Sequence, residues 1–289
     1  MSLAENHVIS NQLKEVVVGK KIVKVITNQN PHTFVWFAME PSQAFSSLEN
    51  SNQYALGYEE CLLNQIVEKS DVNGGSNYLY IGDRALIFNI PTYYHAAGEK
   101  LPLKHQLLLI FDDGSALSFR GSLGGPLFLF QLDEYGKPVS WNSSFPSVLS
   151  DEFSEEFFMN LIAQTEFRSM SAKAFLATKG RIPGLDNSIL HEILWEAKVN
   201  PKTKMVYLTS DDFINMYNAI KKVFPAVIDN GGKDTDKDLF GKEGRYITKV
   251  SKKTLGKPCH CCGELIIKEA YLGGSVYYCP KCQPFVSNK

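Results

Sequence analysis

The chain has 289 residues, of which 44% are hydrophobic and 21% charged, and its formal net charge is -1. This composition is typical of an ordinary globular protein, and the length favours two domains. A net charge this close to zero excludes a uniformly basic nucleic-acid binder, although a local basic stripe is still compatible with phosphate binding. No apolar signal segment opens the sequence and no apolar run is long enough to span a membrane, so we expect a cytoplasmic protein without a membrane partner.

The first half of the chain begins with a short amphipathic helix and continues with strands. In the helix Ile9, Leu13 and Val16 recur at helical spacing, and Gly19 closes it. Runs rich in β-branched and aromatic residues follow, separated by glycine, proline, asparagine and aspartate. We expect strands at residues 22–26, 33–37, 78–81, 86–90, 107–111, 116–119 and 127–131. Many short strands with such breakers predict a β-sandwich.

From about residue 148 the hydrophobic period changes from two residues to that of a helix. The pattern predicts helices at residues 151–164, 171–178, 188–199 and 211–224. Between the second and third helices, glycine and proline fix a rigid two-turn connection that ends at Asn187, which we expect to cap the third helix. The free N–H groups and the dipole of a helix N-terminus can bind an anion there.

Four cysteines near the C-terminus form two CxxC pairs. Sixteen residues separate the first pair, Cys259 and Cys262, from the second pair, Cys279 and Cys282. This is the spacing of a tetrahedral site in which four thiolates hold one structural zinc ion. Because thiols stay reduced in the cytoplasm, metal binding is favoured over disulfides. The residues between the pairs are typical of a hairpin, with its turn at Gly273-Gly274.

A basic stripe, residues 241–258, lies directly before the first cysteine pair. It carries one acid, Glu243, and six cations: Lys242, Arg245, Lys249, Lys252, Lys253 and Lys257. A solvated loop and a phosphate-binding surface are both compatible with this pattern. The position beside the zinc hairpin favours phosphate contacts, for which we select Lys252, Lys253 and Lys257.

These patterns predict an α+β fold in three parts: an N-terminal β-sandwich domain with an initial helix at residues 1–147, a helical domain at 148–240, and a basic loop with a four-cysteine zinc finger at 241–289. Several runs also resemble the formamidopyrimidine-DNA glycosylase and endonuclease VIII family. The helix-two-turn-helix and zinc-finger region of that family is similar to RIPGLDNSILHEILWEAKVNP, DNGGKDTDKDLFGKEG, GKPCHCCG and YYCPKCQ. The strand pair that carries the family's phosphate-binding lysine resembles LPLKHQLLLIFDDGSALSFRGSLGG. The resemblance covers most of the chain and is least clear at residues 39–100 and 131–150.

The resemblance implies a base-excision repair enzyme that removes oxidised bases from damaged double-stranded DNA. We expect the protein to be a monomer and, in a bacterium, to act at the nucleoid. Members of the family extrude the damaged nucleotide, attack the sugar C1′ with an N-terminal amine, form a Schiff base and cleave the strand by elimination. By the same resemblance, Lys104 and Asn187 match two phosphate-binding residues, and the four cysteines match the zinc ligands.

The N-terminal segment departs from the family's pattern, which is a proline followed by glutamate. Here the chain begins Met1-Ser2-Leu3-Ala4-Glu5-Asn6, and Glu5 aligns with the family's second glutamate. We take the amine of Ser2 and the carboxylate of Glu5 as the candidate catalytic pair. Met-Ser-Leu is also compatible with an expression leader, in which case the native amine would lie at Ala4, next to Glu5.

Other positions differ from the family as well. The hairpin turn lacks the family's arginine, Ser122 stands where a methionine fills the void left by the extruded base, and Asp186 replaces a glycine next to Asn187, which puts a negative charge near the expected phosphate. Three hypotheses follow: a glycosylase with abasic-site lyase activity, a relative that binds damaged or abasic DNA without cleaving it, and a zinc-ribbon protein that contacts RNA or another protein.

Overall fold

The computed structural model describes residues 1–27, 29, 35–44, 53–121, 125–138, 145–178 and 180–287. The chain divides into two compact units. The first unit comprises Met1, Asn6–Asn142 and Asp238–Lys242, and the second comprises Ser2–Glu5, Ser143–Lys237 and Glu243–Lys289. The four cysteines therefore belong to the second unit, and the division into three parts stays a prediction.

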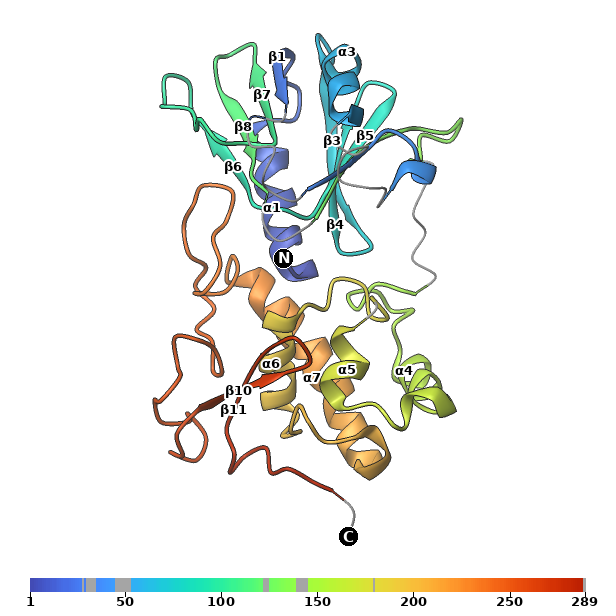
Figure 1. Ribbon diagram of the computed structural model, residues 1–289, viewed down its shortest axis with the longest axis vertical. Coiled ribbons are helices and arrows are strands. Elements are labelled where there is room, and N and C mark those ends of the chain that lie inside the picture. Colours follow the sequence, from blue (N-terminus) through green and yellow to red (C-terminus); the bar gives the residue numbers. More distant parts are fainter. Residues whose placement is uncertain are drawn as a thin grey trace. The chain divides into compact units, whose positions relative to one another are not determined.

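The first unit contains two sheets and most of helix α1 (Leu3–Val16) (Figure 1). One sheet has the strand order β1-β7-β8-β6 and is antiparallel throughout. The other has the order β2-β9-β5-β4-β3; β2 and β9 pair in parallel, and the other described pairs are antiparallel. The strands are β1 (Ile22–Thr27), β2 (Trp36–Ala38), β3 (Val67–Asn73), β4 (Ser76–Ile81), β5 (Arg84–Phe88), β6 (Thr92–His95), β7 (Leu107–Phe111), β8 (Ala116–Phe119) and β9 (Pro126–Gln131). The connections include helix α3 (Tyr58–Leu62) and the 3-10 turns η1 (Pro41–Gln43) and η2 (Ala55–Gly57).

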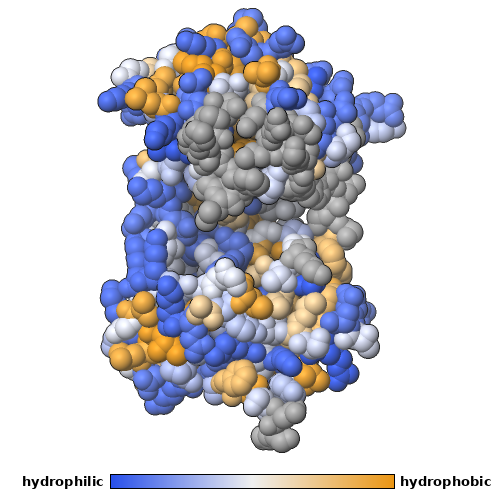
Figure 2. All heavy atoms as spheres, in the orientation of Figure 1, coloured by the Kyte–Doolittle hydropathy of each residue, from blue (hydrophilic) through white to orange (hydrophobic). Residues whose placement is uncertain are grey.

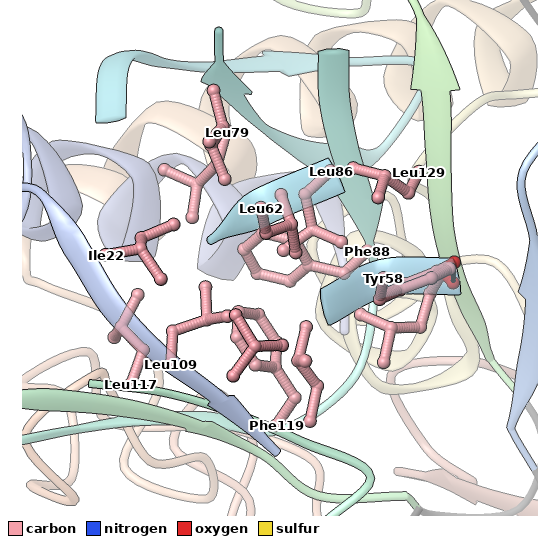
Figure 3. Packing of buried hydrophobic residues seen from close by; sticks show 14 of the residues in the cluster. Ile22, Tyr58, Leu62, Leu79, Leu86, Phe88, Leu109, Leu117, Phe119 and Leu129 are labelled. Atoms are coloured by element: carbon pink, nitrogen blue, oxygen red, sulfur yellow. Dashed lines mark hydrogen bonds between the residues drawn. The ribbon is translucent and has the colours of Figure 1, made fainter. Parts of the chain in front are cut away.

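The core of the first unit lies between the two sheets, which confirms the predicted β-sandwich. Apolar side chains from both sheets and from α3 point toward one another (Figure 3). Phe88 of one sheet and Phe119 of the other are fully buried, with ring centroids 5.0 Å apart and an interplanar angle of 84°. Tyr58 of α3 donates its hydroxyl to the carbonyl oxygen of Ala38 at 3.0 Å. Edge-to-face aromatic packing of this kind stabilises a core beyond the area that it buries.

Strands β7 and β8 form a hairpin whose turn follows from its sequence. Gly114 adopts a φ of +81°, and the Asp113 carboxylate accepts a hydrogen bond from the Ser115 N–H at 2.9 Å. Aspartate and glycine favour such turns because the aspartate side chain accepts a hydrogen bond from a backbone N–H, and glycine, which has no Cβ, tolerates positive φ. Lys104 lies in the loop that precedes β7.

After α1, the described residues of the second unit form the helices α4 (Glu155–Ile162), α5 (Ala172–Ala177), α6 (Asn187–Glu196) and α7 (Ser210–Asp229), and a hairpin of the strands β10 (Ile267–Tyr271) and β11 (Gly274–Tyr278) (Figure 1). The 3-10 turns η3 (Thr165–Phe167) and η4 (Met205–Tyr207) complete it. A side chain caps the N-terminus of each of α4, α5, α6 and α7; the capping residues are, in order, Ser154, Ser171, Asp186 and Thr209. This arrangement confirms the helical part of the predicted fold.

The cap of α6 differs from the prediction. Asp186, not Asn187, is the N-cap: its Oδ1 accepts the N–H groups of Ser188 at 2.9 Å and Ile189 at 3.0 Å. An N-cap residue has extended backbone angles, as Asp186 has, whereas Asn187 is already the first helical residue. The prediction that Asn187 caps α6 was therefore wrong, because the acid one residue earlier occupies the free N–H groups.

The basic stripe is attached to α6 through one buried carboxylate. Glu192 accepts the N–H groups of Lys249 at 3.0 Å and Val250 at 2.9 Å, and the hydroxyl of Tyr246 at 3.1 Å. Buried backbone N–H groups need such partners, since leaving one unpaired costs about 1–3 kcal/mol. Glu192 therefore defines the path of the basic stripe along the second unit.

The surface is of mixed character. On the face shown in Figure 2, hydrophilic and hydrophobic side chains are interspersed over the coloured residues. Among the described helices, none combines the length and the apolar character that crossing a bilayer requires.

Candidate metal centre and nucleic-acid interface

The four cysteines of the two CxxC pairs meet at one point of the second unit. Their Sγ atoms all lie within 4.8 Å of one another, with 3.4 Å between Cys262 and Cys279 and 3.9 Å between Cys259 and Cys282. Four thiolates about 2.3 Å from one ion at tetrahedral angles would be about 3.8 Å apart, so the cluster can hold a metal ion. The Trp195 Nε1–H donates to Cys259 Sγ at 3.3 Å, as outer hydrogen bonds to metal-bound sulfur do.

The turn of the metal hairpin is displaced by one residue from the prediction. Tyr271 pairs with Gly274, so the two turn residues are Leu272 and Gly273, with φ values of 50° and 71°. Positive φ at both positions is the signature of a type I′ turn, which matches the twist of the flanking strands. The predicted turn at Gly273-Gly274 was therefore wrong, and an exposed leucine lies at the tip.

Three side chains fasten this hairpin to the helices. The Asn187 amide donates to the carbonyl oxygen of Ser275 at 3.1 Å, and Lys173 of α5 donates to that of Tyr271 at 2.7 Å. The ring of His191 packs edge-on against Tyr277, with centroids 5.4 Å apart. Asn187 is exposed and lies next to the hairpin strand, while Lys173 is buried. Lys173 was not predicted from the sequence, because nothing in the pattern of α5 distinguishes it from a solvated lysine.

The buried His191 gives the stability of this unit a pH dependence. Burial lowers the pKa of His191 to about 4, and the charges of Lys173 and Lys233 act in the same direction, whereas the Ser275 backbone and Asp186 oppose them. Because the folded-state pKa lies below the unfolded value, stability is full above about pH 6.5 and is lost as the pH falls toward 4. We expect the free energy of unfolding to fall by about 1.4 kcal/mol per pH unit across this window.

Urea titrations between pH 7 and pH 4.5 would measure this slope in the wild type and in His191→Gln. Burial also lowers the pKa values of His7, His95 and His105, so the comparison with the variant isolates the share of His191. If the free energy of unfolding fell equally steeply with pH in both proteins, His191 would not be the source of the pH dependence.

In the first unit, Lys104 lines a cavity of about 520 Å³ formed by residues 100–105 together with Arg120 and Gly121. Lys104 and Arg120 are both exposed, and among the described residues no hydrogen bond or ion pair occupies the Lys104 ammonium. His105 is buried in the same wall, and its Nδ1 has no hydrogen-bond partner in the described part of the chain. The cavity therefore offers cationic groups to an anion. Arg120, which was not predicted from the sequence, lines it together with the predicted Lys104.

The basic stripe provides fewer free cations than its sequence suggests. Lys253 forms an ion pair with Glu243 at 2.7 Å and also donates to the Asp234 backbone, so its charge is already partnered. Lys252 and Lys257 are exposed, and within the described residues neither ammonium forms a hydrogen bond or an ion pair. These two lysines are available to a phosphate backbone.

The N-terminal residues of the second unit place Ser2 against Glu5. The Ser2 N–H donates to Glu5 Oε2 at 3.0 Å, the Ser2 hydroxyl binds the same oxygen, and both residues are buried. The Leu3 N–H donates to the Gly184 carbonyl at 2.7 Å, which ties the segment to the two-turn connection. The other carboxylate oxygen, Glu5 Oε1, forms an ion pair with Lys233.

The buried Lys233 lies among three acidic residues. Its Nζ contacts Glu5 and lies 3.2 Å from Asp236 Oδ2. Burial alone would lower the pKa of Lys233, but the negative charges of Glu5, Asp236 and Asp186 outweigh it and raise that pKa. Burial likewise opposes ionisation of Asp186, but the charge of Lys233 and the hydrogen bonds from the Ser188 hydroxyl and the Ile189 N–H lower its pKa. The charge expected next to Asn187 is thus engaged by the cap and by Lys233.

Fold and site together define a class of protein: a β-sandwich unit combined with a helical unit that carries a four-cysteine hairpin. No family model matches the chain. A formamidopyrimidine-DNA glycosylase of Legionella pneumophila (strain Lens) is 31% identical over 195 residues, which cover 64% of this chain and 68% of the relative. One of Prochlorococcus marinus (strain NATL1A) is 30% identical over 141 residues, 48% of this chain and 49% of the relative.

Solved structures agree in fold. The MutM (Fpg) protein of Thermus thermophilus superposes with a TM-score of 0.74 at 18% identity, covering 99% of this chain and 100% of that one. Lactococcus lactis Fpg, in complex with DNA that contains an abasic site, superposes with a TM-score of 0.75 at 21% identity, covering 98% of this chain and 100% of that one. The chain belongs to the formamidopyrimidine-DNA glycosylase family. Ser122, singled out as a departure from that family, lies outside the described residues.

Proposed function

We propose that this protein is a base-excision repair glycosylase that removes oxidised bases from double-stranded DNA and cleaves the resulting abasic site. The observation that carries the proposal is the contact between Ser2 and Glu5, because removal of Met1 would turn the Ser2 nitrogen into an α-amine 3.0 Å from a carboxylate oxygen. An α-amino group has an ordinary pKa of about 8, so a useful share is unprotonated at neutral pH.

The chemistry then follows from these two groups. The lone pair of the Ser2 amine attacks C1′ of the extruded nucleotide, the glycosidic bond breaks, and its electron pair leaves with the base, which takes up a proton. The attached nitrogen loses a proton to Glu5, and its lone pair then expels O4′ from C1′, so that the C1′–O4′ bond breaks, O4′ takes up a proton and the nitrogen and C1′ form a protonated Schiff base. Loss of a proton from C2′ breaks the C3′–O bond and releases the strand. Glu5 is the group placed to accept and return protons beside the amine.

The four cysteines hold one structural zinc ion in this proposal. Four thiolates without an open coordination position are typical of structural zinc, which adds folding energy and takes no part in the reaction. The ion would stabilise the hairpin that Asn187 and Lys173 fasten to the helices.

Phosphate contacts are proposed for Lys104 in the first unit and for Asn187, Lys252, Lys253 and Lys257 in the second. Lys253 would have to exchange its partner Glu243 for a phosphate, so we expect the smallest contribution from it. Arg120, in the same cavity wall as Lys104, is an additional candidate.

A Lys104→Ala substitution is expected to weaken binding to duplexes of any sequence. Loss of one phosphate contact should make the slope of log K against log salt shallower by about 1. Fluorescence anisotropy with an abasic duplex at several salt concentrations measures this slope. Lys24→Ala, which removes an exposed lysine of β1 outside the cavity, is the matched control. An unchanged slope in Lys104→Ala would remove this lysine from the interface.

A cleavage assay tests the function itself. Protein whose first residue is shown by mass spectrometry to be Ser2 is incubated with matched duplexes that differ only in one formamidopyrimidine lesion. We expect base release and strand cleavage only in the damaged duplex. Tight binding without either product would favour the alternative, a family member that recognises damaged or abasic DNA but has lost catalysis. The absence of an arginine from the hairpin turn at residues 271–275 is the observation that keeps this alternative open.

A further inference from the structure

We propose that Lys233 is a positioning residue for this reaction: its buried ammonium holds the Glu5 carboxylate so that the second oxygen faces the Ser2 amine. The inference rests on the proposed function, since it concerns the same amine. It adds a residue that lies 228 positions away from Glu5 in the sequence.

The two oxygens of Glu5 have separate partners. Oε1 is taken by Lys233, and Oε2 receives both the nitrogen and the hydroxyl of Ser2. The side chains of Lys233 and Glu5 are only 1% and 6% exposed, so water does not compete for either oxygen. A carboxylate held at both oxygens cannot rotate, and its orientation toward Ser2 is therefore fixed by the lysine.

The backbone around Lys233 is rigid enough for this task. A Cβ added to Gly244 would lie 2.0 Å from the carbonyl carbon and oxygen of Gly232, so the two backbone segments touch directly and only glycine fits. The Gly244 N–H also donates to the Lys233 carbonyl at 3.1 Å. This close approach fixes the loop that carries the lysine.

The cation also balances the charge beside the amine. A bare carboxylate at Oε2 would stabilise the protonated, non-nucleophilic amine, whereas a carboxylate paired with Lys233 does so less. The other charged groups near Lys233 are Asp236, at 3.2 Å, and Asp186 at the cap of α6. Replacing Lys233 by a neutral residue leaves the charge of Glu5 uncompensated beside the amine, and should therefore raise the pKa of the amine.

The test compares Lys233→Met and Lys233→Arg with Lys237→Met, which removes an exposed lysine of the same loop. In protein that begins at Ser2 and carries ¹³C-serine, the Ser2 Cα signal followed by NMR against pH reports the pKa of the amine without DNA. We expect Lys233→Met to raise that pKa by about 1 unit, which lowers the rate of borohydride trapping at pH 7 about tenfold, with duplex affinity retained. Lys233→Arg should restore both values, and Lys237→Met should change neither.

Equal amine pKa values in Lys233→Met and the wild type would overturn the positioning role. If Lys233→Met does not fold, Glu5→Gln and the double variant Glu5→Gln/Lys233→Gln decide the question, because a lysine that acts through Glu5 has no further effect once Glu5 is neutral. A further shift of the amine pKa in the double variant would contradict the proposal. Lys233→Met could also shift the pKa of the Ser2 amine while neither this variant nor the wild type forms a borohydride-trapped adduct. That result would contradict the proposed function but would still show that Lys233 acts on the Ser2 amine through Glu5.

Discussion

A Glu5→Gln variant is expected to form the Schiff base at least about a hundredfold more slowly than the wild type, because proton transfer by a positioned side chain is worth about 10²–10⁴ in rate. The variant removes the only carboxylate that contacts Ser2 among the described residues. It also removes one partner of the buried Lys233, which still has Asp236. Single-turnover trapping at saturating abasic duplex measures the rate independently of affinity.

Glu15→Gln is the matched control, since Glu15 is an exposed acid of the same helix α1. Glu15→Gln should form the borohydride-trapped adduct at the wild-type rate. Thermal unfolding of Glu5→Gln shows whether the partly unpaired lysine has also lowered stability, since breaking a buried ion pair costs about 3–5 kcal/mol. A Glu5→Gln protein that is folded and traps as fast as the wild type would remove Glu5 from the reaction.

Loss of the metal is expected to unfold the hairpin of the second unit. A structural zinc contributes about 10 kcal/mol or more to a small site, which a hairpin of two five-residue strands cannot replace from its own packing. A Cys279→Ser variant should lose the ion, the hydrogen-exchange protection of residues 259–283 and affinity for the duplex. Atomic absorption measures the metal content, for which we expect one zinc ion per chain in the wild type.

Cys261→Ser is the control for this experiment. Cys261 is exposed and lies next to the cluster, but its sulfur is not part of it. The variant should retain the ion and the affinity. Equal metal content in the Cys279→Ser and wild-type proteins would contradict the four-thiolate site.

The fold was predicted best where local chemistry and burial agree. Strands β7 and β8 coincide with the predicted residues 107–111 and 116–119, because a strong turn joins two continuous apolar runs. Strand β3 was missed, since Val67–Asn73 is mostly polar and lies at the edge of its sheet. Strand β6 has only four residues directly after a proline, too few for a periodic signal.

In the candidate site, too, local features were predicted from the sequence and long-range contacts were not. The cysteine cluster follows from spacing alone, because each CxxC pair is a local structure. The ion pair of Glu5 with Lys233 and the hydrogen bonds of Glu192 with the basic stripe join residues far apart in the sequence, and no periodicity encodes such pairs. The hairpin turn and the cap of α6 were each misplaced by one residue, since neighbouring residues compete for the same conformational role and tertiary contacts decide between them.

Borohydride trapping with an abasic duplex shows whether the Ser2 amine beside Glu5 is the nucleophile. The protein is first shown by mass spectrometry to begin at Ser2, and the adduct is then digested and mapped. We expect one covalent adduct per chain, on the N-terminal peptide and located at the Ser2 nitrogen. Tight binding of the duplex without an adduct, or an adduct on a lysine side chain in place of Ser2, would contradict it.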